Sequence, residues 1–485
     1  MDVTLRDGHQ SLWATRMTNA MMLPFVPRMD DMGFDWINLV GGAVFDVCVR
    51  FLREDPWQRM RLVKERAPNT PIDVMTRGQS LYTFEMFADD VVELTMRRIR
   101  ANGMERVTIY DALNDTRNLG LSIEVAREEG LYVAAGVVYT ISPVHTDDFY
   151  RRVARELVGL GADAIFLKDQ AGLLTPDRVR TLVPALADEI RDVPLELHSH
   201  SLSGLAEQCY LEAVPLGVDL LCTASLPLAS GASLPPTAYC VKHLAEAGFE
   251  SRLSLDELAE MDDYFTGVAK RHGKPIAVPH RYDPALYRHQ VPGGMISNLH
   301  SQLAEYGMSE RLGETLEEAE QVRVDLGYPI LVSPFAQYVI AQSLLNVVQG
   351  ERYKTIPVEV RRYALGLYGR PAAPVNQDLL DRIVEEDRER SEPMTERPGE
   401  HIAPALPALR EKRGPFESDD DLLLAAFYTG EQLEPLFEAR LADDDAGRMT
   451  AALGPVPYLL AELGGSSRFD EVSIEKSGLR LRLRK

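Results

Sequence analysis

Eight short β-rich runs recur at a nearly constant interval along the first half of the chain. They cover residues 3–7, 36–42, 71–77, 106–112, 132–140, 163–169, 194–200 and 220–225, so their starts lie 26 to 35 residues apart. Several of the intervening stretches have apolar residues at helical spacing. Such a repeat is typical of βα units that close into a parallel barrel of about 250 residues. We therefore predict an α/β fold in which residues 1–288 form a TIM (β/α)8 barrel; an open doubly wound sheet is the alternative, which the count of eight disfavours.

The remainder of the chain follows other patterns. From residue 289 to about 390, apolar positions recur every three or four residues, which predicts an appended α-helical domain. Residues 391–420 are charged and proline-rich, as a linker or extended arm would be. Residues 421–485 form a small C-terminal segment, whose last residues alternate leucine with arginine in the manner of a strand.

The amino-acid composition of the chain limits the classes of molecule that it is expected to bind. The chain has 52 lysines and arginines against 74 aspartates and glutamates, a net charge of −22, which argues against binding nucleic acid or an anionic membrane surface. The apolar stretch 328–348 contains too many polar residues to span a bilayer. We see no secretory signal, and the four cysteines show no CxxC spacing. These features predict a cytoplasmic protein with reduced thiols that binds small molecules or other proteins.

Polar residues stand where several of the predicted strands end. In a TIM barrel the carboxyl ends of the strands carry the active site, so we expect these side chains to converge. Those with candidate roles are Arg6, Asp7, Gln10, Arg77, Gln79, Asp111, Asn114, Lys168, His198 and His200.

Three of these residues form a candidate metal site. His198 and His200 are two apart in a strand, so their imidazoles point to the same side. With Asp7 they make a ligand set that zinc, manganese or cobalt tolerates. The alternative, a solvated HxH at a strand end, is disfavoured by the matching positions of Asp7 and Lys168.

Lys168 follows a buried apolar run, where an ammonium needs a partner or a chemical change. Beside a cation an ammonium would be repelled, whereas a carbamate formed with CO2 would be an anionic oxygen ligand. On residue type alone, an ordinary buried salt bridge with Asp169 is the stronger alternative.

The motifs resemble a known family along most of the chain, from residue 2 to about 376. Stretches such as TLRDGHQSLWATRM, GGAVFDVCVRFLREDPWQR, YDALND, LKDQAGLLTP, ELHSH and QVPGGMISNL resemble the carboxyltransferase component of pyruvate carboxylase, oxaloacetate decarboxylase and transcarboxylase. The resemblance implies a TIM barrel with a helical domain, and a metal held by Asp7, His198, His200 and a carbamylated Lys168. It implies transfer of a carboxyl group between carboxybiotin and pyruvate through an enolate, with Arg6 and Gln10 contacting the substrate.

The resemblance also names residues around the substrate. It places Asp46 near the biotin pocket, although an aspartate at a helix start would serve equally well as a cap. Arg77 and Gln79 are expected in the wall of the site, with a purely structural ion pair as the alternative for Arg77. Asp111 and Asn114 belong to the motif at the end of the fourth strand.

Two departures from the family pattern concern catalysis. Three residues before Asp111 the family carries an arginine, where this chain has Thr108; Arg106 keeps the strand parity but would lie one layer away. A proton-shuttling threonine of the family aligns with Ala232, which leaves Ser233 among the hydroxyls that could replace it. These changes predict slow pyruvate chemistry, or a different carboxylic acid as substrate.

No segment resembles a biotin-attachment motif or an ATP-grasp domain. We therefore expect a biotinyl carrier protein and a biotin carboxylase subunit on separate chains, and we expect this chain to form a homo-oligomer, a dimer. Three functions stay open: a metal-dependent carboxyltransferase subunit acting on a 2-oxo acid or related acid, a biotin-independent decarboxylase or lyase, and a catalytically silent scaffold. The complete set of metal ligands disfavours the scaffold.

Overall fold

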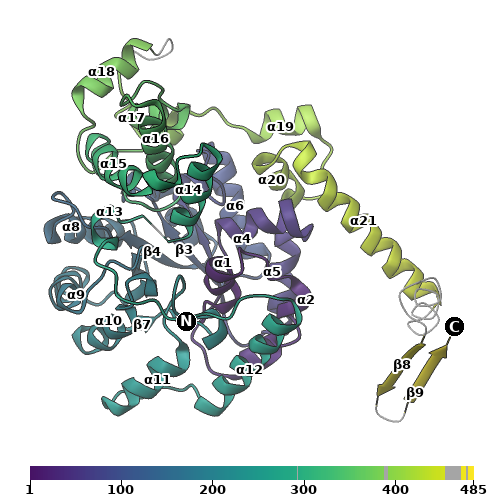
Figure 1. Cartoon of the computed structure of the whole chain (residues 1–485). Coiled ribbons are helices and arrows are strands. Elements are labelled where there is room, and N and C mark those ends of the chain that lie inside the picture. Colours follow the sequence, from purple (N-terminus) through teal and green to yellow (C-terminus); the bar gives the residue numbers. More distant parts are fainter. Residues whose placement is uncertain (292, 387–391, 454–470, 477–478, 485) are drawn as a thin grey trace.

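The computed structural model describes residues 1–291, 293–386, 392–453, 471–476 and 479–484 (Figure 1). Its main sheet has seven parallel strands in chain order: β1 (Ile37–Val40), β2 (Ile72–Thr76), β3 (Arg106–Tyr110), β4 (Tyr132–Val138), β5 (Ala164–Asp169), β6 (Leu195–Ser199) and β7 (Leu220–Leu221). Each strand pairs with the next in the chain, so the sheet curls in one direction. The predicted α/β barrel class is confirmed.

The predicted first strand, residues 3–7, is wrong. Only Asp2 pairs there, through isolated parallel bridges to Ile37 and Thr223 on either side, and Thr4–Gly8 forms a π-helical turn, η1. The Asp2 carboxylate accepts hydrogen bonds from the amide (3.1 Å) and the hydroxyl (2.7 Å) of Thr4, which turn the chain directly after the bridge. Asp2 thus joins the two edges of the sheet in place of an eighth strand.

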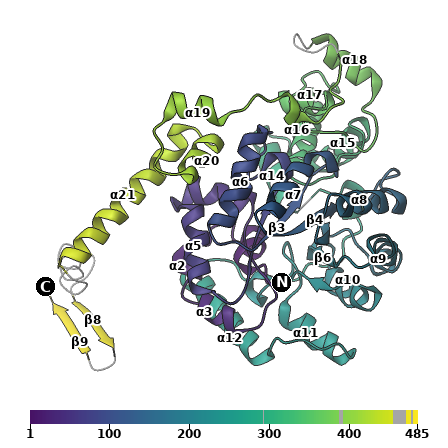
Figure 2. The ribbon, with the colours of Figure 1, turned by 180° about the vertical axis from the view of Figure 1, so that it is seen from behind.

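Helices accompany the barrel strands, and the longer ones cover the outside of the barrel (Figures 1 and 2). They are α1 (His9–Leu12), α2 (Asn19–Met22), α3 (Val26–Asp31), α4 (Gly42–Val47), η2 (Cys48–Leu52), α5 (Pro56–Arg66), α6 (Asp89–Ala101), α7 (Gly120–Glu128), α8 (Asp147–Gly159), α9 (Pro176–Ile190), α10 (Ala206–Ala213), α11 (Thr237–Glu246) and α12 (Leu255–Arg271). The larger ones are amphipathic: α6, for example, buries Val92, Met96 and Ile99 on one face. All four cysteines are free, buried thiols, as predicted.

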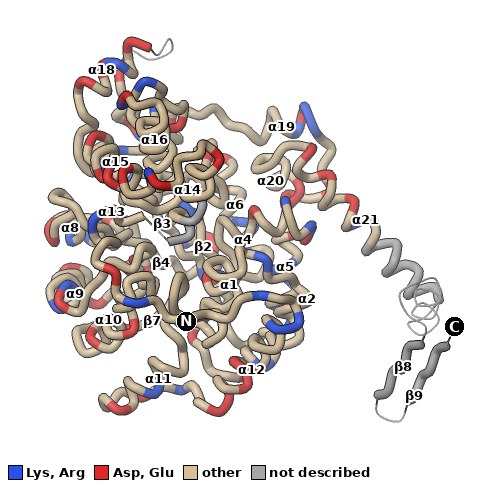
Figure 3. The backbone as a smooth tube through the Cα atoms, viewed as in Figure 1, with Lys and Arg blue, Asp and Glu red and all other residues tan. Residues whose placement is uncertain are grey.

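Charged residues on these helices largely pair with one another. Red and blue segments are interspersed over the outer helices in Figure 3. Arg155 on α8 pairs with Glu189 on α9 at 2.6 Å, and Arg180 on α9 pairs with Glu212 on α10 at 2.7 Å. Because these pairs are exposed and screened by water, each contributes little to stability.

A second group of helices packs against the barrel at the end where β3 and β4 point (Figure 1). It comprises α13 (Leu286–His289), α14 (Gly293–Glu305), α15 (Leu312–Asp325), α16 (Phe335–Gln349), α17 (Val358–Ala364) and α18 (Gln377–Glu386). Its buried residues, among them Val322 and Val339, form one apolar cluster with Phe166 and Tyr110 inside the barrel. In the described part of the chain no helix combines the length and apolar character needed to cross a membrane.

The segment predicted to be a linker lies along the barrel. Arg397 forms an ion pair with Asp89 at 2.6 Å, and Asp90 accepts hydrogen bonds from the amides of Ala405 (3.1 Å) and Leu406 (2.8 Å). The chain continues as α19 (Leu406–Arg413), α20 (Asp419–Phe427) and α21 (Gly430–Leu453), and the antiparallel strands β8 (Glu471–Lys476) and β9 (Leu479–Arg484) follow. In Figures 1 and 2, α21 leads away from the barrel.

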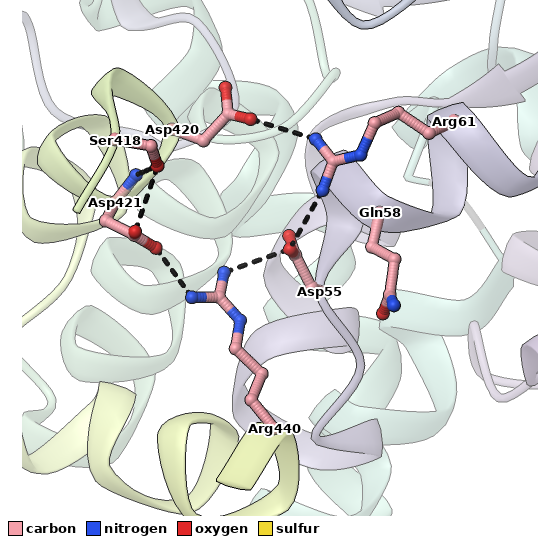
Figure 4. Close-up of a pocket in the computed structure, with 7 residues that line it drawn as sticks. All are labelled: Asp55, Gln58, Arg61, Ser418, Asp420, Asp421 and Arg440. Carbon is pink, nitrogen blue, oxygen red and sulfur yellow. Dashed lines mark hydrogen bonds and ion pairs between the residues drawn. The ribbon is translucent and has the colours of Figure 1, made fainter. Parts of the chain in front are cut away.

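A cluster of five charged side chains fastens α20 and α21 to the start of α5 (Figure 4). Arg440 lies between Asp55 (3.0 Å) and Asp421 (2.6 Å), and Arg61 lies between Asp420 (3.0 Å) and Asp55 (3.7 Å). The three carboxylates are largely buried. We call this cluster the C-terminal clasp.

Candidate active site

Three predicted metal ligands meet at the carboxyl ends of the strands. Asp7 lies in η1 and His198 lies in β6, and His200 is the first residue after β6. Asp7 Oδ2 lies 3.2 Å from His198 Nε2, Asp7 Oδ1 lies 3.6 Å from His200 Nε2, and the two Nε2 atoms are 3.3 Å apart. All three residues are buried, and their ligand atoms lie within 4.8 Å of one another. Within the described residues, this is the only group of histidine, cysteine and acidic side chains compact enough to hold a metal ion.

The protonation states of this cluster suit a cation. Burial alone would raise the pKa of Asp7, but Arg6 and the two imidazoles hold that pKa well below its usual range. Burial, together with Lys168, lowers the pKa of His198 well below its usual range. Asp7 is therefore an ionised carboxylate and His198 a neutral imidazole, the forms that bind divalent metals.

A backbone contact sets the tautomer of His200. Its Nδ1 donates a hydrogen bond to the carbonyl oxygen of Ala232 at 2.7 Å, so Nδ1 carries a proton and Nε2 is the ring nitrogen that faces Asp7. Ala232, predicted from the resemblance to lie in the substrate or biotin pocket, thus contacts a candidate ligand through its main chain. Sequence reasoning missed this role because any residue can supply a carbonyl.

Lys168 lies beside the cluster. Its Nζ is 3.4 Å from His198 Nε2, and the residue is only 2% exposed. Burial and the Arg6 guanidinium lower its pKa to about 7, although Asp7 opposes the shift. The alternative salt bridge with Asp169 is not formed, because the Asp169 carboxylate accepts hydrogen bonds from the amides of Leu173 and Leu174 instead. About half of the amine is therefore neutral at pH 7, and the neutral amine is the form that reacts with CO2.

A cavity of about 200 Å³ adjoins Lys168. Its lining includes the predicted residues Arg6, Gln10, Arg77 and Lys168, together with Tyr110, Gln170, Ser333 and Gln337. Ser333 lies two residues before α16 and Gln337 lies in its first turn, so the appended helices complete the cavity. Sequence reasoning missed them because only the packing of the two parts brings them here; Gln170, two residues after Lys168, could have been found from strand alternation.

Two guanidinium groups face this cavity. Arg77 donates to the Tyr110 hydroxyl (3.2 Å) and to the carbonyl of Thr83 (3.0 Å), and it forms no ion pair with any residue that the structure describes. Arg6 pairs with Asp7, while its Nη2 is buried and has no hydrogen-bond partner among the described residues. A Cβ atom added at Gly42 would displace the Arg77 guanidinium, so the glycine lets this group lie against the start of α4.

Other predicted site residues make structural contacts away from the cavity. Gln79 donates to Asp89 (2.8 Å) and accepts from Arg397 (3.0 Å). Asp111 accepts hydrogen bonds from the amides of the loop that follows it, and burial raises its pKa to about 7. Asn114 exchanges two hydrogen bonds with the main chain of Val138.

The last three candidate residues, Asp46, Thr108 and Ser233, lie outside the cavity lining. Asp46 lies near the end of α4, not at its start, and forms an ion pair with Arg50 at 3.3 Å; the capping alternative is therefore wrong. Thr108 donates to Asp73 at 2.9 Å and does not line the cavity. The Ser233 hydroxyl is buried, has no hydrogen-bond partner in the described part of the chain, and lies outside the cavity lining.

Comparisons with known proteins identify the family. A family model described as a conserved carboxylase domain matches residues 286–452. A pyruvate carboxylase subunit of Methanocaldococcus jannaschii is 42% identical, over 88% of this chain and 76% of that protein. The methylmalonyl-CoA carboxyltransferase 5S subunit of Propionibacterium freudenreichii subsp. shermanii is 32% identical over 98% of this chain and 97% of its own. The carboxyl transferase domain of Rhizobium etli pyruvate carboxylase, solved with pyruvate, matches at a TM-score of 0.83 and 26% identity, covering 99% of this chain and 82% of that one. The chain belongs to the carboxyltransferase family of pyruvate carboxylase and methylmalonyl-CoA carboxyltransferase.

Proposed function

We propose that this protein is the carboxyltransferase subunit of a biotin-dependent enzyme, which moves a carboxyl group between carboxybiotin on a separate carrier and a 2-oxo acid such as pyruvate. The observation that carries the proposal is the Asp7, His198 and His200 cluster beside a small cavity with two guanidinium groups. The relative from Rhizobium etli was solved with pyruvate, which supports a 2-oxo acid of that size.

The donor set fits a divalent cation, because it combines the ionised carboxylate of Asp7, the neutral imidazole of His198, the second imidazole of His200 and an amine able to form a carbamate. Asp7, His198, His200 and carbamylated Lys168 would hold zinc, manganese or cobalt, which would polarise the substrate carbonyl and stabilise an enolate. Arg6 and Arg77 bind the substrate carboxylate, because their guanidinium groups are the cationic arginines of the cavity lining.

The cavity weakens one reason for expecting slow pyruvate chemistry. That expectation counted the charge missing at Thr108, yet Arg77 and Arg6 both line the cavity. The second reason, the missing threonine at Ala232, still stands. Tyr110 and Ser333 are lining residues with hydroxyl groups, and we propose them ahead of Ser233 as proton carriers, because Ser233 lies outside the lining.

The names of the relatives support partners on other chains. The relatives from Methanocaldococcus jannaschii and Propionibacterium freudenreichii are both named as subunits, one of a pyruvate carboxylase and the other of a carboxyltransferase. We therefore propose a biotinyl carrier protein and a biotin carboxylase subunit as partners of this chain.

The test is turnover of oxaloacetate by the purified, metal-loaded chain with and without free biotin. We expect pyruvate to form at a rate that depends on biotin, and His198→Ala to abolish it. Equal rates without biotin would favour a biotin-independent decarboxylase. No turnover by a chain that binds its metal would favour the scaffold.

A further inference from the structure

A continuous line of buried polar side chains runs through the barrel below the cavity. Arg6 Nε donates to Asn38 Oδ1, and Asn38 Nδ2 donates to Asp73 Oδ2. The other Asp73 oxygen accepts from Thr108 Oγ1 at 2.9 Å and lies 3.2 Å from Arg106 Nε. Asn38, Asp73, Thr108 and Arg106 have no exposed surface. The line therefore connects a cavity residue to the deepest part of the barrel without contacting water.

Strand register explains how these side chains come together. Asn38 of β1 is paired with Asp73 of β2, and Asp73 with Arg106 of β3, so all three point to the same face of the sheet. Elsewhere the barrel interior is filled by apolar side chains such as Ala134 and Phe166. Buried ionic groups are costly and add little net stability compared with apolar residues of the same volume. A role other than stability is therefore expected for them.

The amide of Asn38 has only one orientation that satisfies both neighbours. An ionised carboxylate can only accept hydrogen bonds, so Asp73 requires the NH2 group of Asn38 to face it. The carbonyl oxygen of Asn38 must then face Arg6, whose guanidinium can only donate. Arg106 balances the charge of Asp73 and is itself held by both oxygens of Glu196. The direction of each hydrogen bond is thus set from the bottom of the barrel upward.

We infer that Asn38 and Asp73 are positioning residues that fix the Arg6 guanidinium for binding the substrate carboxylate, an inference that rests on the proposed function. Arg6 has a second anchor in Asp7, but that carboxylate is also a candidate metal ligand. Asn38 is the anchor that is independent of the metal. With Nε held by Asn38 and Nη1 held by Asp7, the plane of the guanidinium is fixed, and Nη2 is the nitrogen left without a partner.

The decisive experiment exchanges the two side chains. Asn38→Asp alone places two carboxylates in contact, and Asp73→Asn alone removes the charge that orients the Asn38 amide. The double variant Asn38→Asp/Asp73→Asn restores every hydrogen bond, because the new carboxylate accepts from Arg6 and from the new amide, whose oxygen accepts from Thr108. Total charge is unchanged, and Arg106, which loses its ion pair with residue 73, keeps both oxygens of Glu196 as partners.

The readout is the Kd of oxamate, an unreactive analogue of pyruvate, for each metal-loaded variant, measured by calorimetry alongside metal content and thermal unfolding. We expect each single variant, and Asn38→Leu, to bind oxamate roughly 10- to 100-fold more weakly, as for loss of a hydrogen bond to a charged group. The double variant should regain most of the affinity. Asn346→Leu, which removes a buried amide from α16 that does not line the cavity, controls for general destabilisation.

The outcomes separate this inference from the proposed function. If the native chain neither binds oxamate nor turns over oxaloacetate, the proposed function fails. If the native chain binds oxamate and Asn38→Leu binds it equally well, only the positioning role is overturned. The role is also overturned if the double variant folds and retains metal but binds no better than the single variants.

Discussion

Lys168 should react with CO2 at a rate that levels off above neutral pH. Burial and Arg6 lower its pKa to about 7, from an ordinary value of 10.5. With a pKa of about 7, the neutral fraction of the amine rises from about 10% at pH 6 to about 90% at pH 8, whereas an ordinary lysine is only about 0.3% neutral at pH 8. Since only the neutral amine attacks CO2, the shift raises the reactive fraction of the amine at pH 8 about 300-fold.

The assay follows carbamate formation on the metal-free chain by carbon-13 NMR. Labelled CO2 is supplied at one fixed dissolved concentration, and initial rates are measured from about pH 6 to about pH 9. The lowered pKa sets the direction of the pH dependence. Below about pH 7 the amine is protonated and cannot attack CO2, so the rate falls; well above pH 7 nearly all of the amine is already neutral, so the rate rises little further. We expect a rise of roughly tenfold and then a plateau, and Lys168→Met should lose the signal.

An ordinary lysine would behave differently in the same experiment. Its rate would keep rising about tenfold for each pH unit through pH 9, because its neutral fraction is still small there. Such a profile, or a signal that survives in Lys168→Met, would refute the reasoning from burial.

Three further predictions concern the metal, the C-terminal clasp and the barrel interior. His200→Ala should lose the metal, as elemental analysis of the folded variant will show; full occupancy would remove His200 from the ligand set. Arg440→Ala should lower the free energy of unfolding by about 2 kcal/mol, because Asp55 and Asp421, two largely buried carboxylates of the clasp, lose this partner. Denaturant titration measures the change. The exposed control Arg382→Ala should change the free energy of unfolding by less than about 0.5 kcal/mol. Thr108→Arg should lower the free energy of unfolding by about 3 kcal/mol or more, because it forces a second guanidinium into the water-free barrel interior beside Arg106. A variant as stable as the native chain would contradict the packing described for the barrel interior.

Polar residues at the ends of the predicted strands show which site residues a sequence pattern can predict and which it cannot. The spacing of His198 and His200 was enough to predict that both imidazoles face one side, and the structure brings them together with Asp7. Asp111 and Asn114 also follow the end of a strand, yet both form hydrogen bonds with backbone groups nearby. Backbone groups at strand ends need hydrogen-bond partners wherever they are buried, so polar residues gather there for structural reasons as well as catalytic ones.

The predicted first strand failed for a local reason. A run of alternating apolar residues predicts extended backbone, but the Asp2 carboxylate competes by binding Thr4 and turns the chain. That turn is what places Asp7 at the mouth of the barrel. Strand periodicity carries no information on such a side-chain contact.

The sequence by itself determined the βα repeat, the pairing of the two histidines and the family, because these depend on periodicity and on motifs that are local in the chain. The tertiary structure alone decided which polar residues share the cavity, since Ser333 and Gln337 lie more than a hundred residues from the other lining groups and arrive only when α16 docks on the barrel. It also decided that Arg106 is buried with Glu196 and Asp73, and that Ala232 acts through its carbonyl. Burial and partner choice depend on contacts between segments distant in sequence, which no local pattern encodes.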